Sequence, residues 1–144
     1  MQERPPFLDN YLFFLLAVAS HQASGDFHEE LRQRSVRVSD WRVLTCLGDR
    51  DGLMINELVT LTFLEQPHVT KIVDRLQRDG LVIKVSDPCD RRRARVQITE
   101  SGRAFLVSLQ HIAKDYEEAT LAKLTADEQT MIFNVLRKLV DKST

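Results

Sequence analysis

Hydrophobic residues recur at helical spacing along most of the chain. This spacing predicts helices over about residues 7–33, 40–47, 55–61, 67–78 and 99–121, and a last one that opens at Thr125. Between the fourth and fifth helices, residues 81–86 and the alternation of Val96 and Ile98 with polar neighbours predict two strands. The pattern therefore indicates a mainly α fold with one β-hairpin.

Several polar residues and glycines are placed to start or stop these helices. Ser39 is a predicted N-cap for the second helix, and Gly48 is predicted to end it. Thr99 is a candidate cap for the fifth helix, and Thr125 with Glu128 forms a capping-box pattern for the sixth.

The third and fourth helices, with a turn at Thr62–Glu65, predict a helix-turn-helix. Pro67 suits the start of the fourth helix, where its missing N–H costs nothing. One face of that helix is an apolar stripe predicted to meet the core: Val69, Ile72, Val73 and Leu76. The opposite face is polar and carries Pro67, Thr70, Lys71, Asp74, Arg75 and Arg78.

Charge is unevenly distributed in this chain of 144 residues and formal net charge −1. From His68 to Arg95 there are eight Lys or Arg and four Asp residues, a local excess of +4 that leaves −5 elsewhere. Arg91, Arg92, Arg93 and Arg95 fall at the predicted hairpin. A polar helix beside an arginine-rich hairpin is typical of a protein that binds double-stranded DNA, although a charge run can also be a solvated hairpin tip.

The first predicted helix is apolar on nearly every side, at Leu12, Phe13, Phe14, Leu15, Leu16 and Val18. Such a helix must be buried on more than one side, which favours a subunit interface. Tyr11–Ser20 also has the length of a signal-peptide core, but no positive excess precedes it, and it is too short to cross a bilayer. We expect a cytoplasmic protein without a membrane segment, with secretion as the alternative.

The order of elements resembles the MarR family of winged-helix transcription regulators over about residues 8–141. The resemblance is carried by Val69–Leu76, Asp79–Val82, Asp87–Arg92 and Ile98–Gly102. It implies one domain in a homodimer, with residues 8–36 and 100–141 forming the dimerisation helices and 37–99 the DNA-binding lobe. Thr62-Phe63 departs from the family pattern, since a glycine is common in that turn.

The resemblance implies a recognition helix in a major groove and a wing in the adjoining minor groove. Asp90 is then expected to orient the guanidinium of Arg92. Asp74 would repel phosphate, so we expect it to pair with an arginine. Together with the residue chemistry, this nominates as DNA-binding Gln66, Pro67, His68, Thr70, Lys71, Arg75, Asp90, Arg91, Arg92 and Arg93. The predicted partner is a pseudo-palindromic operator, with half-sites about one helical turn apart.

Members of this family commonly sense small aromatic, often acidic, molecules between the dimerisation and DNA-binding parts. By position, Tyr11, His21, Trp41 and Arg42 are the candidates to bind such a ligand. The alternative is that these aromatic residues belong to the core. On this interpretation the protein is a repressor that a small ligand releases from DNA.

Two other interpretations stay open. One is a thiol-based redox regulator that uses Cys89, although the first-helix cysteine of oxidant-sensing relatives is missing here and Cys46 fits apolar packing. The other is a winged-helix module that binds proteins instead of DNA. The chain shows no metal-ligand spacing, phosphate loop or nucleophile motif, so we predict no enzyme activity, no metal and no cofactor.

Overall fold

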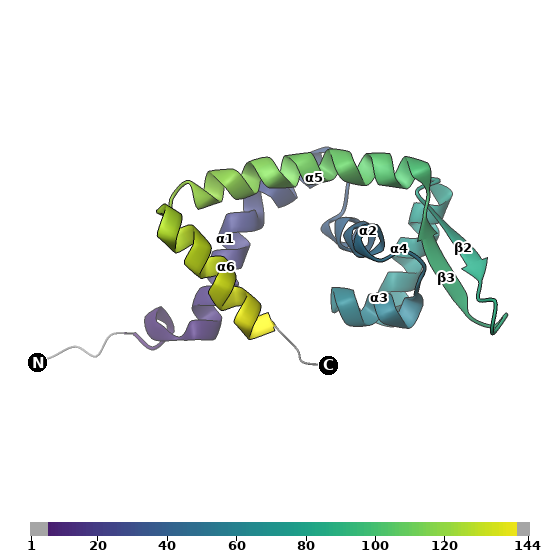
Figure 1. Cartoon of the computed structure of the whole chain (residues 1–144), viewed down its shortest axis with the longest axis horizontal. Helices are drawn as coiled ribbons and strands as arrows, with labels where there is room; N and C mark the ends of the chain where they lie inside the picture. Colours follow the sequence, from purple (N-terminus) through teal and green to yellow (C-terminus); the bar gives the residue numbers. More distant parts are fainter. Residues whose placement is uncertain (1–5, 141–144) are drawn as a thin grey trace, which may run out of the picture. The chain divides into compact units, whose positions relative to one another are not determined.

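The structure is a computed structural model that describes residues 6–140. Within that range the elements are η1 (Leu8–Asn10), α1 (Leu12–Gln33), α2 (Val38–Asp49), β1 (Leu53–Met54), α3 (Ile55–Thr62), α4 (Gln66–Arg78), β2 (Val82–Ser86), β3 (Ala94–Ile98), α5 (Glu100–Leu121) and α6 (Ala126–Val140) (Figure 1). They form two compact units: the winged unit, residues 28–112, and the terminal unit, residues 6–27 with 113–140. The predicted mainly α winged-helix fold is confirmed.

The core of the winged unit is assembled from α2, α3, α4, the sheet and the start of α5. All four residues of the predicted stripe on α4 are buried, as are Val43, Leu44 and Leu47 of α2, Leu58 of α3 and Leu106 of α5. Burial of one face of α4 against this cluster fixes which of its residues point outward.

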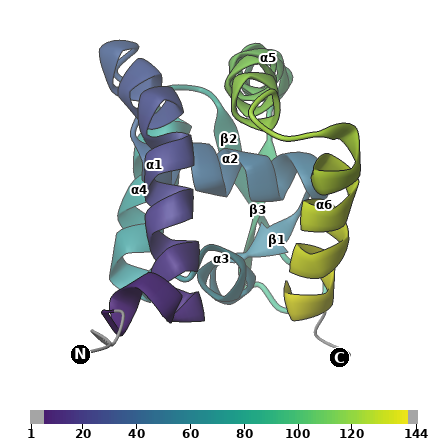
Figure 2. The same cartoon turned by 90° about the vertical axis from the view of Figure 1, so that its left-hand side faces the viewer.

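The sheet is antiparallel, in the order β1-β3-β2 (Figure 2). Val82 pairs with Ile98 and Lys84 with Val96, while Leu53 of β1 pairs with Val96 from the other side. The sequence did not predict β1, because two residues are too short to show an alternating pattern. The β2–β3 hairpin is the wing, and it projects beyond the helices of its unit (Figure 1).

The turn of the helix-turn-helix is made without a glycine. Phe63 adopts the left-handed conformation, with φ of 58° and ψ of 23°, directly after α3. The Thr62 hydroxyl donates to the Leu58 carbonyl at 2.6 Å and accepts the Leu64 N–H at 3.4 Å. These bonds hold the turn in a shape that glycine usually provides.

Three predicted helix boundaries are wrong. The first α-helix begins at Leu12 instead of Phe7, because Tyr11 is extended and Leu8–Asn10 form a 3-10 turn. Ser39 is not an N-cap, since α2 begins at Val38 with Arg37 at the capping position. Gly48 lies inside α2, and a Cβ there would stand 2.4 Å from Leu106 Cδ2, so this glycine permits close packing and does not stop the helix.

The two predicted caps at the C-terminal helices are confirmed. Thr99 Oγ1 accepts the Gly102 N–H at 3.0 Å at the start of α5. Thr125 Oγ1 accepts the Glu128 N–H at 3.2 Å, and Glu128 Oε1 accepts the Thr125 N–H at 3.0 Å, which is a reciprocal capping box.

Large apolar side chains of the terminal unit are exposed on the single chain. On α1 they include Leu12, Phe13, Phe14 and Leu15, and on α6 they include Met131, Ile132, Val135, Leu136 and Leu139. Monomeric proteins rarely expose such contiguous apolar surface.

Candidate nucleic-acid interface

The outer face of α4 presents a row of polar groups to solvent. Gln66, Pro67, His68 and Lys71 are exposed, and Thr70 is half-buried with its hydroxyl donating to the Gln66 carbonyl at 3.0 Å. Because the opposite stripe is fixed in the core, these residues share one accessible face of the helix.

Asp74, the acidic residue on this face, forms an ion pair with Lys84 of β2. The prediction that Asp74 pairs with an arginine is therefore wrong. Lys84 reaches Asp74 because β2 packs against α4, an arrangement that the residue order alone does not reveal. The pair cancels the negative charge of α4 and links the recognition helix to the wing.

The side chain of Arg75 does not point into solvent with the other polar residues of α4. Its guanidinium forms an ion pair with Asp40 of α2, and the side chain of Arg75 is 22% exposed and that of Asp40 11% exposed. The sequence placed Arg75 among the outward-facing DNA contacts. The structure instead turns its charge toward the body of the winged unit.

The wing is anchored at its base by the buried residue Asp87. Its Oδ1 accepts the Cys89 N–H at 2.9 Å, and its Oδ2 lies 3.4 Å from Nη2 of Arg95. Arg95 Nη1 donates to the Gly52 carbonyl at 2.9 Å. One of the four arginines that the sequence grouped together therefore holds the hairpin to the loop before β1.

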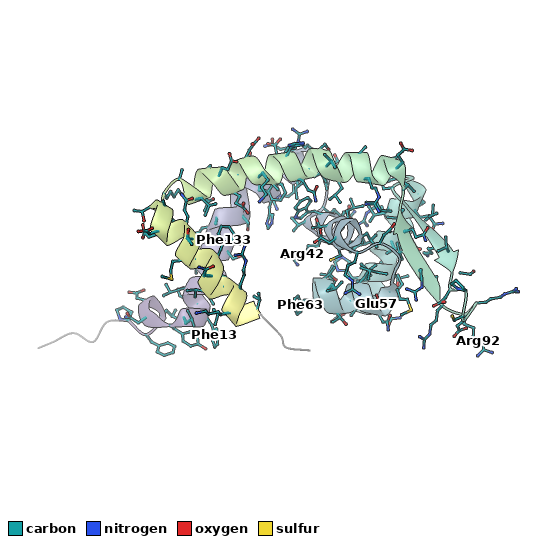
Figure 3. All side chains as sticks on the ribbon, in the orientation of Figure 1. Phe13, Arg42, Glu57, Phe63, Arg92 and Phe133 are labelled. Carbon is teal, nitrogen blue, oxygen red and sulfur yellow. The ribbon has the colours of Figure 1, made fainter. Side chains whose placement is uncertain are left out.

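The other three arginines, Arg91, Arg92 and Arg93, are exposed at the wing tip, and the Arg92 side chain points away from the helices (Figure 3). Asp90 Oδ1 accepts the backbone N–H of Arg92 at 3.0 Å, and its Oδ2 lies 3.7 Å from Nε of Arg93. The expected pair between Asp90 and the Arg92 guanidinium is thus replaced by a backbone bond, with Arg93 as the charged partner.

The four candidate ligand residues fall in both units, two in each. In the terminal unit His21 is exposed on α1, and Tyr11 is exposed with its ring stacked on Phe7 at a centroid distance of 4.9 Å. In the winged unit Trp41 is half-buried against the core, whereas Arg42 is exposed. The shallow pocket of about 210 Å³ in the winged unit is lined by other residues: Arg50, Asn56, Glu57, Thr60 and Leu61.

The two cysteines differ in environment. Cys46 packs beside the core, and burial, followed by the charge of Asp49, raises the pKa of its thiol above the ordinary value. This makes the reactive thiolate scarcer, in line with a packing role. Cys89 is exposed in the wing, and the thiol-switch hypothesis for it stays a prediction.

Residues 6–140 contain neither a candidate metal site nor a candidate membrane-spanning helix. No group of three or more His, Cys, Asp and Glu side chains in this range is arranged to hold a metal ion. No helix in the same range is long and apolar enough to span a membrane.

Sequence reasoning missed Asp40 and Asp51. Asp40 holds Arg75, and Asp51 Oδ1 accepts the N–H groups of Gly52 and Ile98, at 3.0 and 2.9 Å. The signal for Asp51 was its place in the Asp51-Gly52 turn, while Asp40 lies 35 residues before its partner and carries no local signal.

Comparison with known proteins identifies the fold and the family. The sequence pattern of the MarR family matches residues 35–93. The chain is 31% identical to the HTH-type transcriptional repressor NicR of Pseudomonas putida, over 88% of this chain and 80% of that protein.

Solved structures agree. The MarR family transcriptional regulator SPO1453 of Silicibacter pomeroyi is 41% identical with a TM-score of 0.83, covering 94% of this chain and 97% of that one. Bordetella bronchiseptica BpsR, whose DNA binding is regulated by 6-hydroxynicotinic acid, is 25% identical with a TM-score of 0.82, covering 97% of this chain and all of that one. The wing, the recognition helix and these likenesses together show that the chain belongs to the MarR family of transcription regulators.

Proposed function

We propose that this protein is a homodimeric transcription repressor that binds a pseudo-palindromic site in double-stranded DNA. The observation that carries the proposal is the exposed polar face of α4 beside the exposed arginines of the wing tip, within one compact unit. A helix that fits a major groove and a basic hairpin that fits the adjoining minor groove are the two parts such a protein needs. Its place of action is then the cytoplasm, where the DNA is.

The exposed residues of α4 supply the chemistry for base and phosphate contacts. Gln66 suits the paired donor and acceptor of adenine, Lys71 suits guanine or a phosphate, and His68 and Thr70 can donate to either. Pro67 offers only an apolar contact, which fits a thymine methyl group. All five lie in the first six residues of the helix, the end that enters the groove in helix-turn-helix proteins.

The wing arginines suit a narrow, A·T-rich minor groove, whose negative potential attracts a guanidinium without a base-specific bond. Asp90 supports the tip through its bond to the Arg92 N–H and its contact with Arg93. We therefore assign Arg92 to the groove, Arg91 and Arg93 to the flanking phosphates, and Asp90 to holding the tip in shape.

Dimerisation explains the exposed apolar faces of the terminal unit. A second copy that covers the exposed side chains of α1 and α6, Phe13 and Met131 among them, would remove them from water. Two-fold pairing also sets two recognition helices at a fixed separation, so the operator is expected to carry two half-sites about one helical turn apart.

An aromatic acid is the effector that this proposal favours. One relative supports it: BpsR, whose DNA binding is regulated by 6-hydroxynicotinic acid. In the terminal unit, exposed His21 can meet a carboxylate and Tyr11 can stack on a ring; in the winged unit, Arg42 and Trp41 offer the same chemistry. The ligand can weaken DNA binding by no more than the difference between its affinities for the DNA-binding conformation and for the conformation that does not bind DNA.

A gel-shift assay with the DNA flanking the protein's own gene tests the proposal, repeated with a panel of aromatic acids. Arg92→Ala and Lys71→Ala should each weaken binding roughly tenfold, corresponding to about 1–2 kcal/mol. Lys123→Ala, which removes an exposed cation after α5, is the matched control and should bind like the wild type. A protein that is monomeric at micromolar concentration and binds no duplex at low salt would contradict the proposal.

A further inference from the structure

Two consecutive residues of the recognition helix connect it to different parts of the winged unit. Asp74 pairs with Lys84 of β2, and Arg75 pairs with Asp40 of α2. In the first link α4 contributes the acidic partner, and in the second it contributes the basic one. The helix is therefore tied to β2 and to α2 at the same point along its length.

The two links differ in their contact with water. The Asp74 and Lys84 side chains are 51% and 33% exposed, whereas those of Asp40 and Arg75 are 11% and 22% exposed. Salt and solvent therefore screen the first pair far more than the second. The Asp40–Arg75 pair is the more durable of the two anchors.

Asp40 is itself well fixed. It lies in the first turn of α2, where the partial positive charge of a helix N-terminus favours a carboxylate. The same helix inserts Val43, Leu44 and Leu47 completely into the core. A carboxylate on so firmly packed a helix is a rigid reference point for its partner.

Arg75 depends on this carboxylate. Its Nε atom is buried and finds no hydrogen-bond acceptor among residues 6–140. A buried, unsatisfied N–H is unfavourable. The guanidinium therefore stays in this position only while its terminal nitrogen is paired with a carboxylate. Removing Asp40 would thus drive the Arg75 side chain toward solvent and disturb the helix that carries it.

We propose that Asp40 is a positioning residue for DNA binding, and that Arg75 acts through it and not as a direct DNA contact. The apolar stripe fixes the outward face of α4, and the pair holds the helix in that orientation so that Gln66 and Lys71 meet the groove together. This inference rests on the proposed function. It reassigns Arg75, whose residue type and helical phase alone point to a phosphate or base contact.

The test compares Asp40→Asn with the matched control Asp49→Asn, an exposed carboxylate at the other end of α2. The probe is the duplex that wild-type protein selects from a random-sequence pool, with a scrambled duplex of equal length beside it. Asp40→Asn should weaken binding to the selected duplex at least tenfold and leave binding to the scrambled duplex within about twofold. Asp49→Asn should change neither. If Asp40→Asn binds the selected duplex as tightly as the wild type or more tightly, Arg75 is a contact that Asp40 restrains, and the proposal is overturned.

The salt dependence of Arg75→Gln gives a second measure that does not depend on the fate of the Asp40 variant. Loss of a direct phosphate contact lowers the slope of log affinity against log salt by about one, whereas loss of a positioning residue leaves it unchanged. We expect weaker binding with an unchanged slope. A slope lowered by one overturns the proposal.

Amide hydrogen exchange separates failure of this inference from failure of the proposed function, because it needs no DNA. In Asp40→Asn, exchange should accelerate over residues 66–78 and stay as in the wild type over residues 126–140. If wild-type protein binds no duplex, the proposed function fails while this comparison still tests the link. Unchanged exchange in α4 would overturn the inference.

Discussion

Asp87 and Arg95 form an ion pair at the base of the wing, with Oδ2 of the first 3.4 Å from Nη2 of the second. Asp87 is buried, and its other oxygen accepts the N–H of Cys89. The pair therefore connects the first strand of the hairpin, the turn and the second strand. One buried carboxylate thus contributes to the shape of the wing base at three points of the hairpin.

Replacing Asp87 with Ala should destabilise the protein by about 1–3 kcal/mol, because the Cys89 N–H and the charged Arg95 both lose their acceptor. The free energy of unfolding from urea denaturation checks this. Asp90→Ala, which removes an exposed carboxylate from the same hairpin, should change that free energy by no more than about 0.5 kcal/mol. Equal losses in both variants would show that the Asp87 pair has no special role.

Gly102 permits the close approach of α5 to the backbone of Leu81, just before β2, and to Ile98 at the end of β3. A Cβ at this position would lie 2.1 Å from the backbone oxygen of Leu81 and 2.7 Å from a side-chain carbon of Ile98. Gly102→Ala should therefore lower the free energy of unfolding by about 1–3 kcal/mol, since backbone cannot move aside cheaply. Gly25 lies in a helix, and a Cβ there would have no atom within 4 Å. Gly25→Ala should therefore raise the free energy of unfolding by about 0.5–1 kcal/mol. A loss in both would point to a helix-wide effect instead of a local clash.

Periodicity predicted most of the fold. The stripe from Val69 to Leu76 is buried as expected, because a helix with one apolar face has one favourable way to meet a core. Boundaries were less predictable. Gly48 lies inside α2 and not at its end, and its lack of a side chain makes room for Leu106, a residue 58 positions away in the chain.

The candidate site was predictable in kind but not in its pairings. Exposure of Lys71 and Arg92 follows from helical phase and from the hairpin. The partners of Asp74 and Arg75, by contrast, depend on how β2 and α2 pack on α4, which residue types do not encode. The sequence does not distinguish a charged residue that binds DNA from one that forms an ion pair within the protein. Only the packing of the elements distinguishes them.

The capping box of α6 predicts a measurable pH effect. Hydrogen bonds from the Thr125 backbone and hydroxyl lower the pKa of Glu128 below its usual value. A carboxyl whose pKa is lower in the folded state stabilises the protein above its unfolded-state pKa, and this contribution is lost as pH falls through the folded-state value. Thr125→Ala removes the hydroxyl and keeps the backbone N–H, so it should raise the pKa of Glu128 part of the way toward the ordinary glutamate value, measured by NMR titration of the side-chain carboxyl. The stability difference between the two proteins should be larger at pH 6 than below about pH 4. A Glu128 pKa that does not move in the variant would contradict the role of the box.

The Asp74–Lys84 pair predicts that Lys84 supports DNA binding indirectly, by neutralising the negative charge of Asp74. Lys84→Met uncovers a negative charge on the face of α4 that meets DNA, so duplex affinity should fall roughly fivefold, about the Coulomb energy of one nearby charge pair in water. Asp74→Asn should raise affinity by a similar factor. The decisive comparison is Lys84→Met in the Asp74→Asn background, measured by gel shift at two salt concentrations. If Lys84 acts by covering Asp74, its removal there should cost little; if it binds phosphate itself, the loss should be the same in both backgrounds and the role assigned to the pair would be wrong.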